Sequence, residues 1–233
     1  MTQYKHYSFD LWLTLIKSNP LFKTERTRIF HERFNPFRKP IEEVAFIFRQ
    51  VDLMVNAINE KTGKNIDADE MYLMVINMIS NFSNDFRSVD LGSIYDEMEE
   101  LLFKYLPEIY SDETISTLQH LKKNQFCTYN ILSNTGFIRG KTLREVLKRL
   151  GLFDFFDFHI YSDEVGMSKP NTELFKLMLN KVSELGKNCA PSDIVHIGDN
   201  DIADVKGAEI AGITGILINS NNRSINTLLC AQL

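Results

Sequence analysis

Five short apolar runs, rich in β-branched and aromatic residues, recur along the chain and predict β-strands. They lie at Tyr4 to Phe9, Phe126 to Leu132, Phe158 to Tyr161, Ile194 to Ile197 and Ile213 to Ile218. After the second run, stretches with helical spacing separate the strands; one of them, Thr142 to Leu150, stops at Gly151. A further helix is expected around Pro170, with this proline in its first turn. Strands that alternate with helices indicate an α/β fold with a parallel sheet.

Between the first two predicted strands the pattern changes, because the long segment after Ile16 contains no convincing strand. Apolar residues recur there at helical spacing at Ile41, Val44, Ala45, Phe48, Val51, Val55 and Ile58. This stretch stops at Gly63, and Asp67 with Glu70 has the spacing of a capping box that opens another helix. A third amphipathic stretch ends near Pro107. We therefore expect residues 18–107 to form a helical insert in a core made of residues 1–17 and 108–233.

Composition narrows the classes of function. Hydrophobic residues make up 44% and charged residues 24% of 233 residues, which is typical of a globular protein. A net charge of -5 argues against a nucleic-acid partner. The cysteines at positions 127, 189 and 230 are far apart and contain no CxxC pair, which favours a cytoplasmic protein without disulfides or zinc. No apolar run is long enough for a signal peptide or a membrane span, so no membrane association is expected.

Polar residues follow four apolar runs at the carboxyl ends of the predicted strands, where open α/β sheets bind their ligands. They are Asp10 in YSFDLWLTL, Ser133 and Asn134 in NILSNTG, Lys169 in SDEVGMSKPN, and Asp199 with Asp204 in HIGDNDIAD. This combination suits phosphoryl transfer to a protein carboxylate. Mg²⁺ would offset the repulsion between carboxylate and phosphate, while a lysine and a hydroxyl would stabilise the transferring oxygens.

The order and placement of these segments resemble the four signature motifs of the haloacid dehalogenase (HAD) superfamily. The resemblance implies a Rossmann-like core in which the helical insert is a C1-type cap that closes over the site and selects the substrate. It also implies a role for each matched residue. Asp10 would be the nucleophile, Ser133 with Asn134 would bind phosphate, Lys169 would stabilise charge, Mg²⁺ would be held by Asp10, Asp199 and the Trp12 carbonyl, and Thr14 and Asp204 would support them.

Trp12 departs from the family pattern. Phosphatases of this family usually carry an aspartate two residues after the nucleophile, which protonates the leaving group and activates water. Indole cannot exchange a proton at useful pH, and a positioned acid or base typically contributes about a hundredfold to ten-thousandfold in rate. We therefore expect a magnesium-dependent phosphohydrolase that forms an aspartyl-phosphate with a small phosphorylated metabolite. Its turnover of ordinary monoesters should be slow unless another group replaces the acid.

Three alternatives stay open. The dehalogenases and phosphonate hydrolases of the family also lack that aspartate, and a protein that binds phosphate without efficient turnover would fit as well. The acidic segment GDNDIAD favours phosphoryl chemistry over dehalogenation, which needs no metal. Structural roles are expected for two further groups of residues. Arg26, Arg28 and Arg33 are interpreted as one solvated helix face. His196 is interpreted as a buried histidine with satisfied hydrogen bonds. Neither the substrate nor the oligomeric state can be inferred from the sequence.

Overall fold

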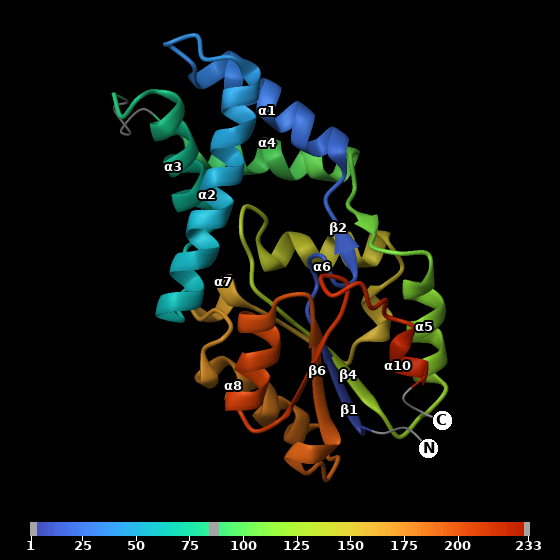
Figure 1. The fold of residues 1–233 in the computed structure, drawn as a ribbon. Helices are drawn as coiled ribbons and strands as arrows, with labels where there is room; N and C mark the ends of the chain where they lie inside the picture. Colours follow the sequence, from blue (N-terminus) through green and yellow to red (C-terminus); the bar gives the residue numbers. More distant parts are fainter. Residues whose placement is uncertain (1–3, 84–88, 231–233) are drawn as a thin grey trace.

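The computed structural model describes residues 4–83 and 89–230, with only the backbone at residue 230. Positions 1–3, 84–88 and 231–233, which fall within the ranges expected for the core and the insert, lie outside the described residues. The chain forms a parallel sheet flanked by helices, and a separate group of helices lies beyond the carboxyl ends of the strands (Figure 1).

Five parallel strands form the central sheet in the order β5-β4-β1-β6-β7. Their bounds are His6–Phe9 for β1, Thr128–Ser133 for β4, Phe158–Tyr161 for β5, Ile194–Gly198 for β6 and Thr214–Leu217 for β7. All five predicted runs form strands, and the parallel α/β sheet is confirmed. Because β1 pairs with both β4 and β6, the residues that follow these three strands meet at one edge of the sheet.

Helices cover both faces of the sheet. One face packs against α5 (Glu113–Lys122), α6 (Gly140–Arg149) and α10 (Thr227–Cys230), and the other against α8 (Thr172–Glu184) and α9 (Gly207–Ile210); the short α7 (Ser162–Val165) follows β5. The prediction for Pro170 was wrong in detail. The side chain of Asn171 caps α8 by accepting a hydrogen bond from the Glu173 amide, so Pro170 precedes the helix.

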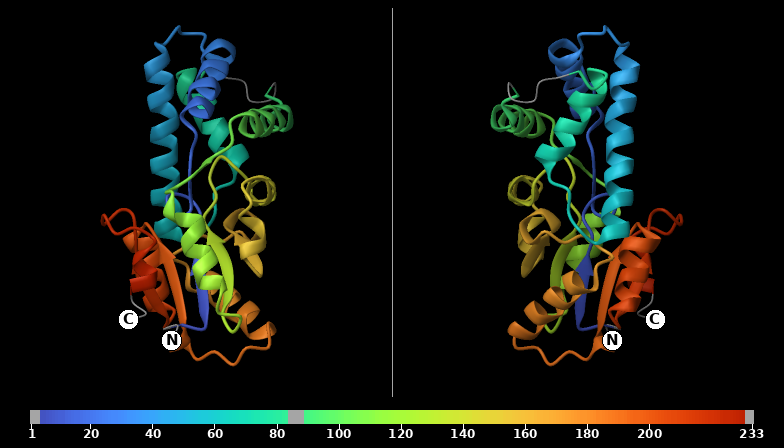
Figure 2. Two further views of the ribbon diagram at one scale, coloured as in Figure 1. Left: turned by 90° about the vertical axis from the view of Figure 1, so that its right-hand side faces the viewer. Right: turned by 90° about the vertical axis from the view of Figure 1, so that its left-hand side faces the viewer.

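The insert contains the helices α1 (Pro20–Phe34), α2 (Ile41–Thr62), α3 (Ala68–Ile79) and α4 (Leu91–Lys104). They pack around a hydrophobic cluster of their own, which Phe137 joins from the loop after β4. The predicted stop at Gly63 is confirmed, since Gly63 closes α2 with a left-handed φ of 65°. The capping box of Asp67 and Glu70 is also present at the start of α3. Figure 2 shows these helices as a layer distinct from the sheet.

Several connections join the insert to the sheet domain, and two of them involve the backbone of the insert. The chain enters and leaves the insert through a short antiparallel ribbon of β2 (Ile16–Lys17) and β3 (Glu108–Ile109), which the sequence pattern did not predict. The second connection is the end of α2, where the Gly63 carbonyl accepts hydrogen bonds from the Ser168 amide and the Asn171 side chain. Among the described residues, no helix is long and apolar enough to cross a membrane.

Candidate active site

Asp10 is the first residue after β1, and three interactions fix its position. Its amide donates a hydrogen bond of 2.8 Å to the Ile197 carbonyl of the neighbouring strand. Its Oδ2 atom accepts a hydrogen bond of 3.2 Å from the Thr14 hydroxyl, and its Oδ1 atom lies 2.7 Å from Lys169 Nζ. Asp10 is buried, so these groups replace water around its carboxylate. Thr14 and Lys169 are therefore brought to Asp10.

Lys169 lies at the centre of the site and is 1% exposed. Its ammonium donates to Asp10 Oδ1, to Asp204 Oδ1 at 2.6 Å and to the Leu132 carbonyl at 2.7 Å, which uses its three donors. Asn134 holds the lysine backbone from both sides: its Oδ1 accepts from the Lys169 amide and its Nδ2 donates to the Lys169 carbonyl. In this structure the Asn134 side chain thus positions Lys169.

Asp204 lies in a π-helical turn, Asp201–Lys206, that follows β6. A β-carbon at position 198 would overlap the Asp204 carboxyl group, so Gly198 permits its close approach. Asp204 Oδ2 accepts a hydrogen bond of 2.9 Å from the Asn200 amide, and Oδ1 lies 3.1 Å from His196 Nε2. Burial lowers the pKa of His196, whose Nδ1 lies 2.9 Å from the Ser8 hydroxyl. His196 is therefore a satisfied buried histidine, as expected.

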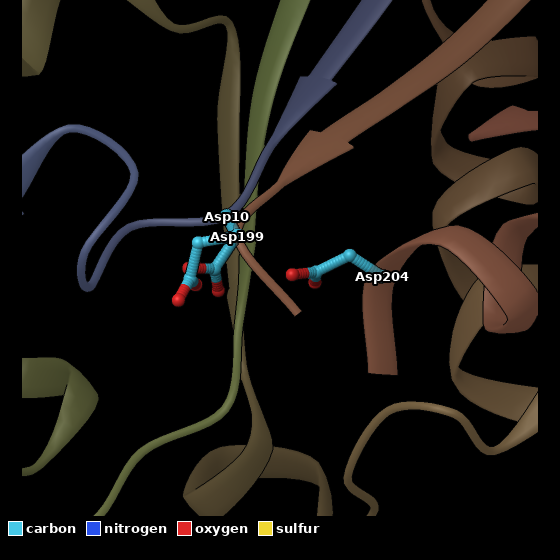
Figure 3. A group of neighbouring side chains, drawn as sticks. All are labelled: Asp10, Asp199 and Asp204. Atoms are coloured by element: carbon cyan, nitrogen blue, oxygen red, sulfur yellow. The ribbon is translucent and has the colours of Figure 1, made fainter. Parts of the chain in front are cut away.

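Asp10, Asp199 and Asp204 each place a carboxylate oxygen within 4.8 Å of the others (Figure 3). Burial, and then the charges of Asp10 and Asp204, raise the pKa of Asp199 to about 7. Burial also raises the pKa of Asp10 to about 6, although Lys169 opposes this shift. When all three are ionised, three carboxylates and one ammonium leave two negative charges. This surplus and the oxygen donors fit a divalent cation such as Mg²⁺.

Ser133 and Trp12 lie near the site. Within the described residues, neither side chain forms a hydrogen bond with Asp10. Ser133 ends β4 and is fully buried, and its hydroxyl donates to the Asn134 carbonyl at 3.1 Å. Trp12 lies half-buried in the turn after β1 and packs against the core of the sheet domain. Its neighbour Leu13 has a left-handed φ of 58°.

Two residues of the insert, one beside this site and one further along the insert, were not recognised from the sequence. Glu60 on α2 accepts a hydrogen bond of 2.7 Å from the Asn200 side chain, next to Asp199. Arg26 was expected on a solvated face, which is wrong, because it is only 9% exposed. The signal that reveals it is spacing: Arg26 lies one helical turn from the buried Phe22 and one from Phe30. Arg28 and Arg33 are exposed and pair with glutamates.

The sequence matches the haloacid dehalogenase-like hydrolase family over residues 4–212. A glyceraldehyde 3-phosphate phosphatase from Methanothermobacter thermautotrophicus is 38% identical over 135 residues, which are 57% of this chain and 53% of that protein. The alignment thus spans about half of that relative.

The fold is shared with solved structures. The magnesium-bound HAD hydrolase YfnB from Bacillus subtilis has a TM-score of 0.70 at 19% identity, with 95% of this chain and 91% of that chain covered. A 2-haloacid dehalogenase from Pseudomonas syringae has a TM-score of 0.63 at 20% identity, with 99% and 100% covered. The family match extends over most of the chain, and the structural likeness extends over nearly all of it. The protein therefore belongs to the haloacid dehalogenase-like hydrolases.

Proposed function

We propose that the protein is a magnesium-dependent phosphohydrolase that acts on a small phosphorylated metabolite, with residues 18–107 as its cap. The observation that carries this proposal is the cluster of Asp10, Asp199 and Asp204 around the buried Lys169. Such a cluster is suited to a divalent cation and a phosphate together. The likeness to a glyceraldehyde 3-phosphate phosphatase supports the same reaction class.

In this proposal Asp10, Asp199 and the backbone carbonyl of Trp12 hold the magnesium ion. When bound, Mg²⁺ offsets the repulsion between the carboxylates and the phosphate. Asp204 contributes indirectly, because it accepts hydrogen bonds from Lys169 and from the Asn200 amide beside Asp199. The metal ligands are therefore held by a network of buried partners.

The chemistry follows from the position of Asp10. Its carboxylate attacks phosphorus, so that a new oxygen–phosphorus bond forms while the ester bond to the leaving group breaks. Water then attacks the aspartyl-phosphate, which releases inorganic phosphate and restores Asp10. Lys169 keeps Asp10 oriented and offsets charge on the transferring oxygens. Trp12 cannot donate the proton that the leaving oxygen requires, so leaving groups that need little protonation should react fastest.

The test is phosphate release from p-nitrophenyl phosphate, whose leaving group needs little protonation. Asp10→Asn should abolish release in the presence of magnesium, and chelation of magnesium should abolish it reversibly in the wild type. Asp201→Asn removes an exposed carboxylate from the turn that also carries Asp204, and this variant should retain activity. Turnover by a folded Asp10→Asn protein would refute the role of Asp10.

Trp12 favours two rival functions that the same assays separate. One rival is a 2-haloacid dehalogenase, as one structural neighbour is named. Such an enzyme would release halide from 2-chloropropionate without metal. A regulatory protein would bind inorganic phosphate and magnesium without turning over phosphate esters, acyl phosphates or phosphonates. Phosphate release that depends on magnesium excludes both rivals.

A further inference from the structure

Arg26 lies where α1, α2 and the loop after β4 meet, and it is held among aromatic rings. Its Cζ atom is 4.0 Å from the ring centre of Phe48, 4.9 Å from that of Phe137 and 5.4 Å from that of Phe22. Phe48 and Phe22 belong to the insert, whereas Phe137 belongs to the loop that begins after Ser133. Stacking fixes the plane of a guanidinium and leaves its N–H groups available to other partners.

Within residues 4–83 and 89–230, the Arg26 guanidinium forms no hydrogen bond or ion pair with another side chain or with the backbone. Its Nε atom is buried and without a partner. Five N–H donors on a side chain that is nine-tenths buried normally find acceptors, because an unpaired buried cation is costly. The stacked and unpaired Arg26 therefore has the form of a binding group for an external acceptor.

Charges around Arg26 favour an anion. Asp52 on α2 interacts electrostatically with Arg26, Lys23 and Arg49, so three cations lie near one carboxylate. Among the described residues, none of these three cations forms an ion pair. Asp52 is solvent-exposed, so solvent reaches the side of α2 on which it lies. A positive local field in a chain of net charge -5 would attract a negatively charged group.

One face of α2 connects Arg26 with the acidic cluster. Near Arg26, Asp52 lies against the β4–α6 loop, where a β-carbon on Gly136 would be 3.8 Å from its Oδ1 atom. Eight residues further along the same face, Glu60 binds Asn200 beside Asp199. Eight residues of α-helix span about 12 Å. Figure 1 shows α2 extending from the insert down to the core, where Glu60 contacts the loop after β6.

We infer that Arg26 binds a second anionic group, a carboxylate or a phosphate, on the leaving part of the substrate. The inference rests on the proposed function and names its substrate class: phosphate esters of small metabolites that carry a further acidic group. The reacting phosphate lies at the acidic cluster, and the second anion lies at the far end of the α2 face. A planar guanidinium suits this task, because it can donate two parallel hydrogen bonds to either oxyanion.

The test compares matched esters in steady-state kinetics. 3-Phosphoglycerate and glycerol 3-phosphate differ only in a carboxylate against a hydroxymethyl group, and fructose 1,6-bisphosphate and fructose 6-phosphate differ in a second phosphate. Arg26→Gln should raise KM for the more acidic member of at least one pair by about 10- to 100-fold. KM for its partner should change by less than about twofold. Arg26→Lys should recover part of the loss, and Arg28→Gln, on the exposed face of α1, should change neither value.

The pair that responds identifies the second anion as carboxylate or phosphate. A purely structural role for Arg26 would change KM equally for both members of each pair, and that result would overturn the inference, as would no change at all. Binding separates this failure from failure of the proposed function. The same four esters can be titrated by calorimetry into the Asp10→Asn protein with and without Arg26→Gln. A loss of affinity confined to the acidic esters supports the inference even if no ester is hydrolysed, whereas unchanged affinity or no binding overturns it.

Discussion

Glu60 of α2 and Asn200 of the loop after β6 are joined by a hydrogen bond of 2.7 Å between Oε1 and Nδ2. Asn200 is the neighbour of Asp199 along the chain, and its amide also donates to Asp204. A side chain of the insert thus contacts the loop that carries the acidic cluster. The position of the insert and the geometry of this loop are therefore coupled.

Glu60→Ala should weaken this coupling. We expect KM for a phosphate ester to rise several-fold and the free energy of unfolding to fall by about 1 kcal/mol, the usual contribution of one hydrogen bond. Glu60→Gln keeps an acceptor and should stay close to the wild type. Gln50→Ala, at an exposed position of α2, is the control for truncation of a helical side chain. If Glu60→Ala and Gln50→Ala behave alike in kinetics and urea unfolding, the coupling is absent.

Lys169→Met should destabilise the protein most at neutral pH. Asp10 and Asp204 would lose the buried cation they share, which typically costs about 3–5 kcal/mol. Without Lys169, the pKa of Asp10 should rise further above its unfolded value. The destabilisation should therefore shrink as the pH falls and the carboxylates take up protons. Urea unfolding at pH 5 and pH 7.5 measures this difference, with the exposed Lys176→Met as control. A loss of equal size at both pH values would contradict the explanation.

Asp199 should make the metal-free protein less stable as the pH rises. Its folded pKa of about 7 lies above the ordinary value of 3.8. Between these values the folded protein keeps a proton that the unfolded chain has released, so stability falls with rising pH in this window. Asp199→Asn should therefore gain stability relative to the wild type at pH 8 but not at pH 4. Urea unfolding with a chelator tests this.

Magnesium provides a second readout for Asp199. At pH 8 it should stabilise the wild type and have little effect on Asp199→Asn, because the variant has lost a ligand. Asp201→Asn, two positions away and exposed, should follow the wild type with and without magnesium. If the free energies of unfolding of the metal-free wild type and Asp199→Asn change in parallel between pH 4 and pH 8, Asp199 does not titrate as expected.

Leu13 adopts a left-handed backbone conformation that costs an L-residue about 1–2 kcal/mol, and half of its side chain is exposed. Leu13→Gly should relieve this strain. After allowance for the greater freedom of glycine in the unfolded chain, we expect the free energy of unfolding to rise by up to about 1 kcal/mol. Leu53→Gly, at an exposed helical position of α2, should instead lose about 1 kcal/mol. Equal losses in thermal unfolding for both variants would contradict the assignment of strain.

Trp12→Asp should raise kcat for phosphate monoesters with poor leaving groups by tenfold or more, because it supplies a proton donor two residues after the nucleophile. Trp12→Asn is the control, because asparagine has nearly the same size as aspartate but cannot supply the proton. This variant should show no gain in kcat. Phosphate release from an alkyl phosphate measures the effect. A folded Trp12→Asp protein without any gain would mean that another group already donates the proton or that another step limits turnover.

The sheet and much of the site could be predicted from the sequence, because buried strands and their polar ends leave a local pattern. Apolar runs located all five parallel strands, and the residues that follow them include Asp10, Asp199 and Asp204, which the fold brings together. The stop of α2 at Gly63 was also visible, since a left-handed helix end favours glycine.

What could not be predicted depends on tertiary contacts. The ribbon of β2 and β3 has two residues in each strand, too few to show alternation. Asn134 is held by the Lys169 backbone, 35 positions away, and no local pattern reveals that pairing. Arg26 was misassigned because a charged residue usually indicates an exposed position. The sequence does not show that aromatic rings enclose this side chain. The proposed roles of Ser133 and Trp12 remain predictions.

The β2–β3 ribbon has a consequence for how such a chain can be altered. Ile16 and Ile109 are paired, so the segment between them starts and ends at neighbouring points. Opposed residues in antiparallel strands lie only about 5 Å apart. A segment whose two ends lie that close could be joined to the chain at this ribbon without changing the spacing of its two connections to the sheet domain. The ribbon thus gives the insert two closely spaced ends, and under the proposed function grafting between proteins at these two isoleucines would exchange substrate preference.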